Sequence, residues 1–391
     1  MHLSQISEAH TRECRDEMKR SFLEFFAGIG LIRVALERRG WKCLFANDND
    51  LGKTKIYMDN YGIGSIDTRS IEELSARDVP SATLATASFP CQDLSEAGPR
   101  RGIGGPRSAV FWHFVRILRE MRSTRPPLVL LENVRGFLTG QEGRNLRVAV
   151  KALNDLGYAC DVVLVDAKYF VPQSRPRVFV SAIQESVAKR VAPSDVCGLR
   201  HDHPFRTKQI LRQINSSSNL KWLFLQLPPV SRLGVKLEQV LDPPEKVPSD
   251  YWFSKEEIER HLAMMPSNHK KKLELLRLQG RSAAVTMYRR IRSVGQRAEL
   301  RFDGIAGCLR TPRGGSSKQF VVILDKETLN IRKLTIPEMS RLMGLPESFI
   351  LPNKYLAAYK ALGDAVAVPA VEWVADSLLE PLVRHVCQTT S

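Results

Sequence analysis

The segment FLEFFAGIGLIRVALERRGWKCLFAND, from Phe22 to Asp48, decides the fold class. An apolar run over 22–26 predicts a strand, an amphipathic stretch over 31–40 predicts a helix that ends at a glycine, and 43–48 predicts a second strand. Strands that alternate with helices predict an α/β fold with a doubly wound, mostly parallel sheet, whose working side chains gather where the strands end. The alternation continues, with further strands expected at 82–88, 127–134, 160–167 and 177–183 and a helix at 108–123.

This alternation stops near residue 185. Serine, proline and basic residues then increase, which predicts a second, smaller domain. Residues 270–313 hold 12 Lys or Arg and 3 Asp or Glu, a local balance of +9 within a total of +16. We expect this domain to contact a phosphate backbone. The expected organisation is a polar lead-in at 1–20, the α/β domain at 21–184, the second domain at 185–330, and a helical segment at 331–391 that returns to the α/β domain.

Composition narrows the class of protein. The 391 residues carry 58 Lys and Arg against 42 Asp and Glu, an excess that favours nucleic acid as the partner. The sequence has no apolar run of about 18 residues and no apolar leader, so we expect neither a membrane span nor secretion. Its 7 cysteines include no Cys-x-x-Cys pair, which predicts no metal site and a reduced, cytoplasmic setting.

Cys91 lies in a loop, SFPCQDLSEAG, directly after a predicted strand. None of the 8 histidines is placed to act as its base, and no second cysteine is near, which argues against a protease or a redox centre. Glu132 ends the next strand and should face the same crevice. Arg175 and Arg177 are two residues apart at a strand start and should share one face. Taken singly, Glu132 fits a helix cap or surface ion pair equally well, and the arginines fit a surface strand.

The turn after the first strand suggests a cofactor. Phe26, Gly28 and Gly30 form a Phe-x-Gly-x-Gly turn that lets a ligand approach the backbone closely. Arg33 stands where a dinucleotide fingerprint has its third glycine, which argues against a pyridine-nucleotide oxidoreductase. Asp48, about 20 positions further on, suits hydrogen bonds to a ribose diol. The combination predicts an adenosyl ligand without a pyrophosphate, namely S-adenosylmethionine.

The motifs FFAGIG, ANDND, SFPCQDLSEAG, LENV, PQSRPR, RKLTIPEMSRLMGLPESF and LGDAV follow one another in this order. The sequence thereby resembles the DNA (cytosine-5)-methyltransferases of the bacterial restriction–modification type, over nearly the whole chain except 185–330. The resemblance implies that Cys91 adds to C6 of a cytosine flipped out of the duplex, and that Glu132 contacts N3 and the exocyclic amine. Arg177, with Arg175 nearby, would contact the O2 edge, and a methyl group would pass from S-adenosylmethionine to C5.

The resemblance also assigns binding residues. Two positions depart from the family pattern: Asp364 stands where the family has asparagine, and Cys308 where many relatives have threonine. The implied cofactor-binding residues are Glu24, Phe26, Gly28, Gly30, Asp48, Asn49, Asp67, Pro90, Asp364 and Ala365, and the implied DNA-binding residues are Gln92, Ser95, Arg289, Arg290, Arg310 and Arg313.

Two alternative functions remain beside this one. A tRNA-directed relative of the same fold usually shows Pro-Pro-Cys-Gln, whereas this chain has Phe89 before Pro90, which favours DNA. A catalytically silent DNA-binding regulator would have lost the nucleophile or the acid, whereas Cys91, Glu132 and Arg177 are all present. The expected partners are double-stranded DNA and an accompanying restriction endonuclease, and we expect a monomer.

Overall fold

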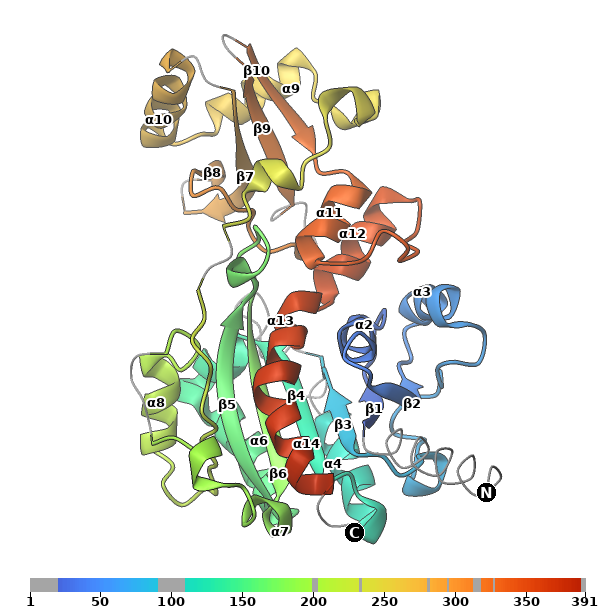
Figure 1. The fold of residues 1–391 in the computed structure, drawn as a ribbon. Coiled ribbons are helices and arrows are strands. Elements are labelled where there is room, and N and C mark those ends of the chain that lie inside the picture. Colours follow the sequence, from blue (N-terminus) through green and yellow to red (C-terminus); the bar gives the residue numbers. More distant parts are fainter. Residues whose placement is uncertain are drawn as a thin grey trace, which may run out of the picture. The chain divides into compact units, whose positions relative to one another are not determined.

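The computed structural model describes residues 20–90, 110–198, 203–231, 234–279, 282–293, 295–311, 318–325 and 328–387. The chain divides into two compact units (Figure 1). Unit 1 comprises residues 1–165, 176–230 and 370–391, and unit 2 comprises 166–175 and 231–369.

Unit 1 is built on a six-stranded sheet with the strand order β2-β1-β3-β4-β6-β5. The pairs β1–β2, β1–β3 and β3–β4 are parallel, and β4–β6 is antiparallel. The α/β class with a mostly parallel sheet is therefore confirmed. The strands are β1 (Ser21–Phe25), β2 (Lys42–Asn47), β3 (Leu84–Ala87), β4 (Leu128–Val134), β5 (Tyr158–Asp166) and β6 (Pro176–Gln184).

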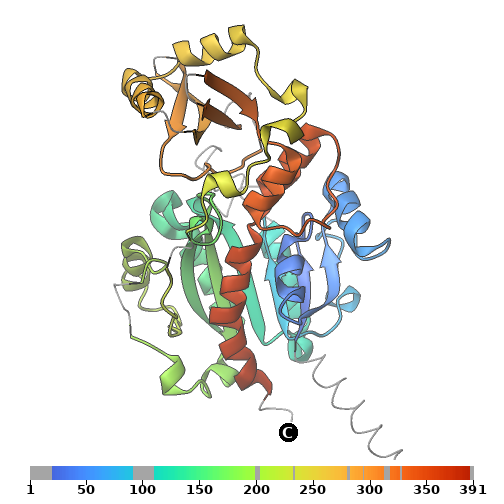
Figure 2. The same ribbon diagram turned by 45° about the horizontal axis from the view of Figure 1, so that its top comes forward.

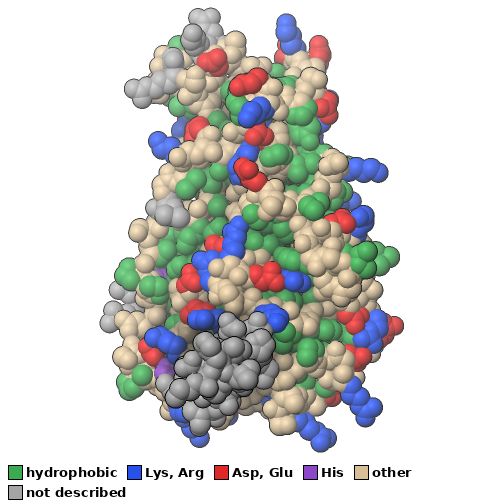
Figure 3. Space-filling view, turned by 45° about the vertical axis from the view of Figure 1, so that its right-hand side comes forward, with side chains coloured by type: hydrophobic (Ala, Val, Ile, Leu, Met, Phe, Trp, Pro, Cys, Tyr) green, Lys and Arg blue, Asp and Glu red, His purple; other side chains and the backbone are tan. Residues whose placement is uncertain are grey.

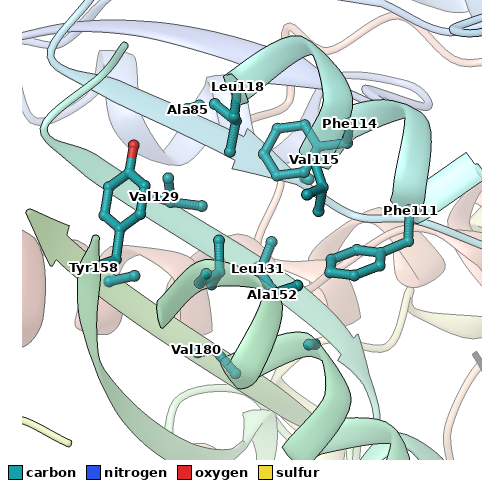
Figure 4. Packing of buried hydrophobic residues seen from close by; sticks show 14 of the residues in the cluster. Ala85, Phe111, Phe114, Val115, Leu118, Val129, Leu131, Ala152, Tyr158 and Val180 are labelled. Carbon is teal, nitrogen blue, oxygen red and sulfur yellow. The ribbon is translucent and has the colours of Figure 1, made fainter. Parts of the chain in front are cut away.

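Helices cover both faces of this sheet. Figures 1 and 2 show α14 lying over one face, and α4 and α6 lie over the other in Figure 1. The apolar residues of α4 point into the sheet, since Phe111, Phe114 and Leu118 pack on Val129 and Leu131 of β4 (Figure 4). The helices are α2 (Leu31–Glu37), α3 (Leu51–Tyr61), α4 (Val110–Glu120), α5 (Gly136–Thr139), α6 (Arg144–Asp155), α7 (Glu185–Ala188), α8 (Lys208–Asn215), α13 (Val368–Val374, which spans the unit boundary) and α14 (Glu380–Cys387).

Strand β4 shows how the sequence positions a site. Its residues from Leu128 to Leu131 are buried on both faces, as expected for a central strand between two helical layers. The apolar run stops at Glu132 and Asn133, which are buried polar residues at the carboxyl end. Polar groups buried at a strand end need partners, and these partners define the site described below.

Unit 2 contains a four-stranded antiparallel sheet with the order β10-β9-β7-β8. One face packs against α9 and α10 through a core that includes Met287, Phe320 and Val322. The elements are α9 (Lys255–Ala263), α10 (Ser267–Leu278), β7 (Ala283–Arg292), β8 (Gly295–Arg301), β9 (Gln319–Asp325), β10 (Thr328–Lys333), α11 (Ile336–Met343) and α12 (Tyr355–Asp364).

The boundaries of the units differ from the expected domain limits at 185 and 331. Residues up to 230 belong to unit 1, because Arg206 forms a buried ion pair with Asp161 of β5 at 2.5 Å, and Ile210 and Ile214 join the core of the sheet. Residues 331–369 belong to unit 2, where Arg332 of β10 pairs with Glu338 of α11. Packing between residues far apart in sequence determines both unit boundaries. The local sequence pattern does not predict such packing.

Charged side chains are interspersed on the surface. Figure 3 shows basic and acidic groups side by side on one face. On the helices of unit 1, Lys55 pairs with Asp59 at 2.9 Å and Arg33 with Glu37 at 2.7 Å. Within the described residues, no helix has both the length and the apolar character that crossing a bilayer requires.

Candidate active site

The turn after β1 is left-handed at three positions. Phe26, Gly28 and Gly30 have φ angles of 57°, 59° and 81°. A Cβ atom at Gly30 would lie 2.6 Å from the ring of Tyr61 and 2.8 Å from that of Tyr57, so only glycine fits there. At Gly28 no described atom lies within 4 Å of the Cβ position. The turn thus exposes backbone beside open space at the carboxyl edge of the sheet.

Asp48 joins this turn to the end of β2. Its Oδ2 accepts a hydrogen bond from the backbone N–H of Gly28 at 2.9 Å, and its Oδ1 accepts one from Asp50 at 2.9 Å. Asp48 is half-buried and its neighbour Asn49 is exposed. Two backbone donors fix the carboxylate, and each oxygen keeps a further lone pair for a hydroxyl donor. This geometry fits the ribose diol of an adenosyl group.

Asp67 lies beside the end of β2. The side-chain amide of Asn47 donates to the carbonyl oxygens of Asp67 and Arg69, and the N–H of Asp67 donates to Ala46. Arg69 Nη2 is 2.6 Å from Asp67 Oδ2, and this hydrogen bond lowers the pKa of Asp67. Asp67 is therefore a carboxylate at neutral pH whose oxygens are engaged by Arg69.

Glu24 is buried and its carboxyl group faces the protein. Tyr57 donates its hydroxyl to Oε2 at 3.0 Å, and the backbone N–H of Arg33 donates to Oε1 at 3.1 Å. Burial raises the pKa of Glu24 to about 8, against the lowering effects of the Tyr57 hydrogen bond and the charge of Arg33. Glu24 thereby fixes the start of α2, and Tyr57 is a supporting residue that the sequence motifs did not indicate.

Glu132 and Arg177 meet at the carboxyl end of β4. In the antiparallel β4–β6 pair, Glu132 is opposite Phe179 and Val134 is opposite Arg177, which puts Glu132 and Arg177 on one face. Arg177 Nε lies 3.0 Å from Glu132 Oε1, and the two side chains are 11% and 10% exposed. The structure therefore brings together two residues that the sequence placed 45 positions apart.

Asn133, on the opposite face of β4, was not among the predicted residues. Its Nδ2 donates to the carbonyl oxygen of Phe89 at 3.2 Å. Phe89 is buried against the rings of Phe111 and Phe137, and the next residue, Pro90, is exposed. This bond ties the chain just before Cys91 to the strand that carries Glu132. The asparagine of the LENV motif was the available signal.

Four predicted site residues, namely Cys91, Gln92, Ser95 and Arg313, lie outside the described residues. Of the other predicted DNA-binding residues, Arg290 and Arg310 are exposed. Arg289 lies with its guanidinium 5.8 Å from the centre of the Phe320 ring.

Arg175 and Arg177 have different neighbours, because β6 begins at Pro176 and Arg175 precedes it. The buried guanidinium of Arg175 donates to the carbonyl oxygens of Leu309 at 2.6 Å and Gly363 at 2.9 Å, and to that of Ala365. It also lies 3.2 Å from the sulfur of Cys308. Arg175 thus holds together the two segments that carry the departures from the family pattern.

Asp364, the other departure, is exposed and accepts a hydrogen bond from the hydroxyl of Thr311. The two segments approach closely, since a Cβ atom at Gly363 would lie 2.6 Å from the backbone nitrogen of Thr311. Asp364 therefore has a neutral partner within unit 2.

The fold is similar to that of solved methyltransferases. The Dnmt2 methyltransferase of S. pombe superimposes with a TM-score of 0.61 at 20% identity, over 93% of this chain and 98% of that one. The Entamoeba histolytica methyltransferase EhMeth also gives 0.61, at 16% identity over 94% and 98%. These likenesses show that the fold is that of a methyltransferase.

The family follows from the sequence comparisons. The profile of the C-5 cytosine-specific DNA methylases matches residues 20–380, so the chain belongs to this family and is a DNA (cytosine-5)-methyltransferase. The Type II methyltransferase M.HpaII of Haemophilus parainfluenzae is 28% identical over 93% of this chain and 90% of its own length. M.DsaV of Dactylococcopsis salina is 27% identical over 92% and 85%. Family and fold imply S-adenosylmethionine as the methyl donor.

Proposed function

We propose that this enzyme methylates C5 of a cytosine within a specific duplex sequence, through a covalent bond between Cys91 and C6 of the flipped-out base. The observation that carries the proposal is the Glu132–Arg177 pair, held at 3.0 Å where β4 ends. Asn133 of the same strand binds the carbonyl of Phe89, two residues before Cys91. A carboxyl group, a guanidinium and the described chain that leads to Cys91 thus meet the end of β4.

The chemistry assigns one task to each group. The Cys91 thiolate forms a bond to C6, while Glu132 holds a proton at N3 and accepts a hydrogen bond from the exocyclic amine, so the ring electrons move toward C5. Arg177 orients Glu132 and donates to O2. S-adenosylmethionine, when bound, supplies the methyl group. After C5 gains the methyl group, loss of its proton restores the double bond and expels Cys91. The base must leave the stack first, because C6 is inaccessible in a duplex.

The turn after β1 and Asp48 would hold the cofactor. Gly28 leaves open space beside the backbone, and Asp48 presents fixed carboxylate oxygens to a diol. Glu24 acts indirectly, since its own oxygens bind Tyr57 and Arg33. The other residues that the family resemblance assigns to the cofactor are Phe26, Gly30, Asn49, Asp67 and Pro90 in unit 1 and Asp364 and Ala365 in unit 2.

Unit 2 would supply DNA recognition. Lys333 is opposite Phe320 in the sheet, and its ammonium and that of Lys318 lie 5.9 and 6.0 Å from the centre of the Tyr355 ring. Burial and the charges of Arg289 and Lys333 lower the pKa of Lys318, which shows that these cations are close. We name Arg289, Lys318 and Lys333 the cationic face. A phosphate backbone would neutralise it. We infer a restriction–modification role, with a cognate endonuclease as partner, because the relatives are Type II methyltransferases.

Methyl transfer from labelled S-adenosylmethionine tests the proposal. The wild-type protein should label duplex DNA, and Cys91→Ser should label none, because an alcohol is far less nucleophilic than a thiolate. Bisulfite sequencing of DNA from expressing cells should then locate the methylated sequence. Equal transfer by Cys91→Ser would reject the covalent route, and transfer to tRNA in place of duplex DNA would reject the substrate.

A further inference from the structure

A pocket of about 400 Å³ lies on unit 1 between α4, α6 and the segment 216–220 that follows α8. Neither the cofactor turn nor the Glu132–Arg177 pair contributes to it. Four cationic side chains line the pocket, Arg119, Arg144, Arg147 and Lys151, against one carboxylate, Asp155. We name it the α4–α6 pocket.

The charges in the α4–α6 pocket are only partly compensated. Lys151 pairs with Asp155 at 2.7 Å. Arg147 donates to the carbonyl of Glu142 at 2.8 Å and to the side chain of Gln213. Arg119 and Arg144 are exposed, and their guanidinium groups make no hydrogen bond or ion pair with any residue that the structure describes. Cations gathered around one hollow raise the local potential and attract an anion.

The wall of the pocket adds a second chemical feature. Trp112, in the first turn of α4, is 42% exposed and lines the pocket together with the apolar side chains of Val148, Ala152 and Leu220. The rings of Trp112 and Phe111 form a T-shaped pair, with 5.3 Å between their centroids and 66° between their planes. An exposed aromatic face among arginines is the arrangement that binds unpaired nucleotides, with bases stacked and phosphates neutralised.

The volume and position of the α4–α6 pocket indicate which kind of nucleic acid it can bind. A volume of about 400 Å³ accommodates a nucleotide but not a base-paired duplex, and stacking on Trp112 requires an unpaired base. Helices α4 and α6 follow β3 and β4 along the chain, so Trp112 and Arg144, in their first turns, lie toward the edge of the sheet that carries Glu132. We propose that the α4–α6 pocket binds single-stranded DNA outside the target site. This inference rests on the proposed function only in taking DNA as the source of the strand.

The test uses the full-length protein and a fluorescent single-stranded oligothymidylate of about eight nucleotides, which contains no target cytosine. R119Q/R144Q should weaken binding at least about tenfold and reduce the slope of log K against log salt by about 1.4, or ~0.7 for each lost phosphate contact. The strand should quench tryptophan fluorescence, and Trp112→Phe should remove that quenching. The control K189Q/R190Q changes two exposed cations of unit 1 away from the pocket and should bind as the wild type does.

Each outcome decides the inference. Wild-type affinity in R119Q/R144Q, or unchanged quenching in Trp112→Phe, would overturn it. Displacement of the strand by polyglutamate at equal concentration would assign the pocket to an acidic polypeptide instead, and tighter binding of oligouridylate would assign it to RNA. Methyl transfer to duplex DNA by the wild-type protein tests the proposed function separately, so either idea can fail alone.

Discussion

Two arginine–carboxylate pairs of this enzyme differ in how deeply they are buried. Glu338 receives Arg332 at 2.6 and 2.8 Å, the N–H of Thr335 at 2.8 Å and the N–H of Asp242 at 2.7 Å, and both side chains of the ion pair are fully buried. Arg177 Nε lies 3.0 Å from Glu132 Oε1, and the two side chains keep 11% and 10% of their surface exposed.

The difference separates a structural pair from a reactive one. Isolated buried ion pairs contribute little net stability, because desolvation offsets the attraction. The Arg332–Glu338 pair, with all its neighbours in place, therefore fixes the orientation of α11 on β10. The Glu132–Arg177 pair leaves part of each group accessible at a sheet edge, so a substrate can exchange contacts with it.

Among changes to these two pairs, Glu132→Gln should have the largest effect. The amide cannot hold the proton at N3, so the rate of methyl transfer should fall by about 10² to 10⁴. The free energy of unfolding should change by less than about 2 kcal/mol, because the side chain is partly exposed. Single-turnover transfer of labelled methyl and urea unfolding measure the two quantities.

The matched control for Glu132→Gln is Glu185→Gln, which follows β6 and removes an exposed pair with Lys221 at 2.6 Å. It should leave the transfer rate unchanged. A wild-type rate in Glu132→Gln would show that the Glu132–Arg177 pair is structural. It would contradict the functional difference from the Arg332–Glu338 pair.

Glu338→Gln should act on stability instead of chemistry. It leaves Arg332 buried without a counter-charge, which costs about 3–5 kcal/mol. Urea unfolding of the full-length protein should show this loss. The double variant R332M/E338L should recover most of the lost stability, because it removes both charges. A loss below about 1 kcal/mol would contradict the structural assignment.

The contrast also shows what the sequence could and could not predict. The strand at 22–26, the turn at Gly28 and the acid at Asp48 were predictable, since local periodicity and spacing place all of them on one βαβ unit. The LENV motif marked Glu132 as a site residue, whereas the RKLTIPEM motif did not show that Glu338 is fully buried beside Arg332. The burial of Glu338 depends on packing between residues far apart in sequence, such as Asp242, whose N–H donates to Glu338.

Arg175 is a second residue whose neighbours could not be predicted from the local sequence pattern. Period-two spacing predicted that it shares a face with Arg177, but Arg175 precedes β6 and binds the carbonyls of Leu309 and Gly363. The place where a strand begins is set by its pairing partner, here β4. A side chain just outside the strand is therefore free to turn toward another segment.

Glu24 is a third buried carboxyl group, and its protonation should make the free energy of unfolding depend on pH. Its pKa is raised to about 8 in the folded protein from an ordinary value of 4.5. The folded state therefore binds the proton more tightly, so this group's stabilisation is complete below about pH 4.5 and is lost as pH rises through about 8. Between these values the free energy of unfolding should fall by up to about 1.4 kcal/mol per pH unit.

Urea unfolding at several pH values between about 5 and 9 measures this slope, and Glu24→Gln provides the reference that lacks the titration. The difference between the two proteins should grow in favour of Glu24→Gln as pH rises. Parallel profiles would show that burial does not control the protonation of Glu24.

The smallest effect concerns an exposed pair on the other sheet. Arg290 lies 4.0 Å from Glu299 and is 55% exposed, so this contact contributes little to stability and leaves the guanidinium open to a phosphate. R289A/R290A should weaken duplex binding several-fold and lower the salt slope by about 0.9 for each phosphate contact removed.

Arg301→Ala is the matched control, since Arg301 lies on the neighbouring strand and is engaged by Asp303 at 2.5 Å. It should leave the salt slope as it is. If R289A/R290A keeps the wild-type slope while the cationic-face variant K318Q/K333Q loses it, the DNA lies against the Tyr355 end of the sheet and not along β7. That result would assign the phosphate contacts of unit 2 to Lys318 and Lys333, beside the ring of Tyr355, and would exclude Arg289.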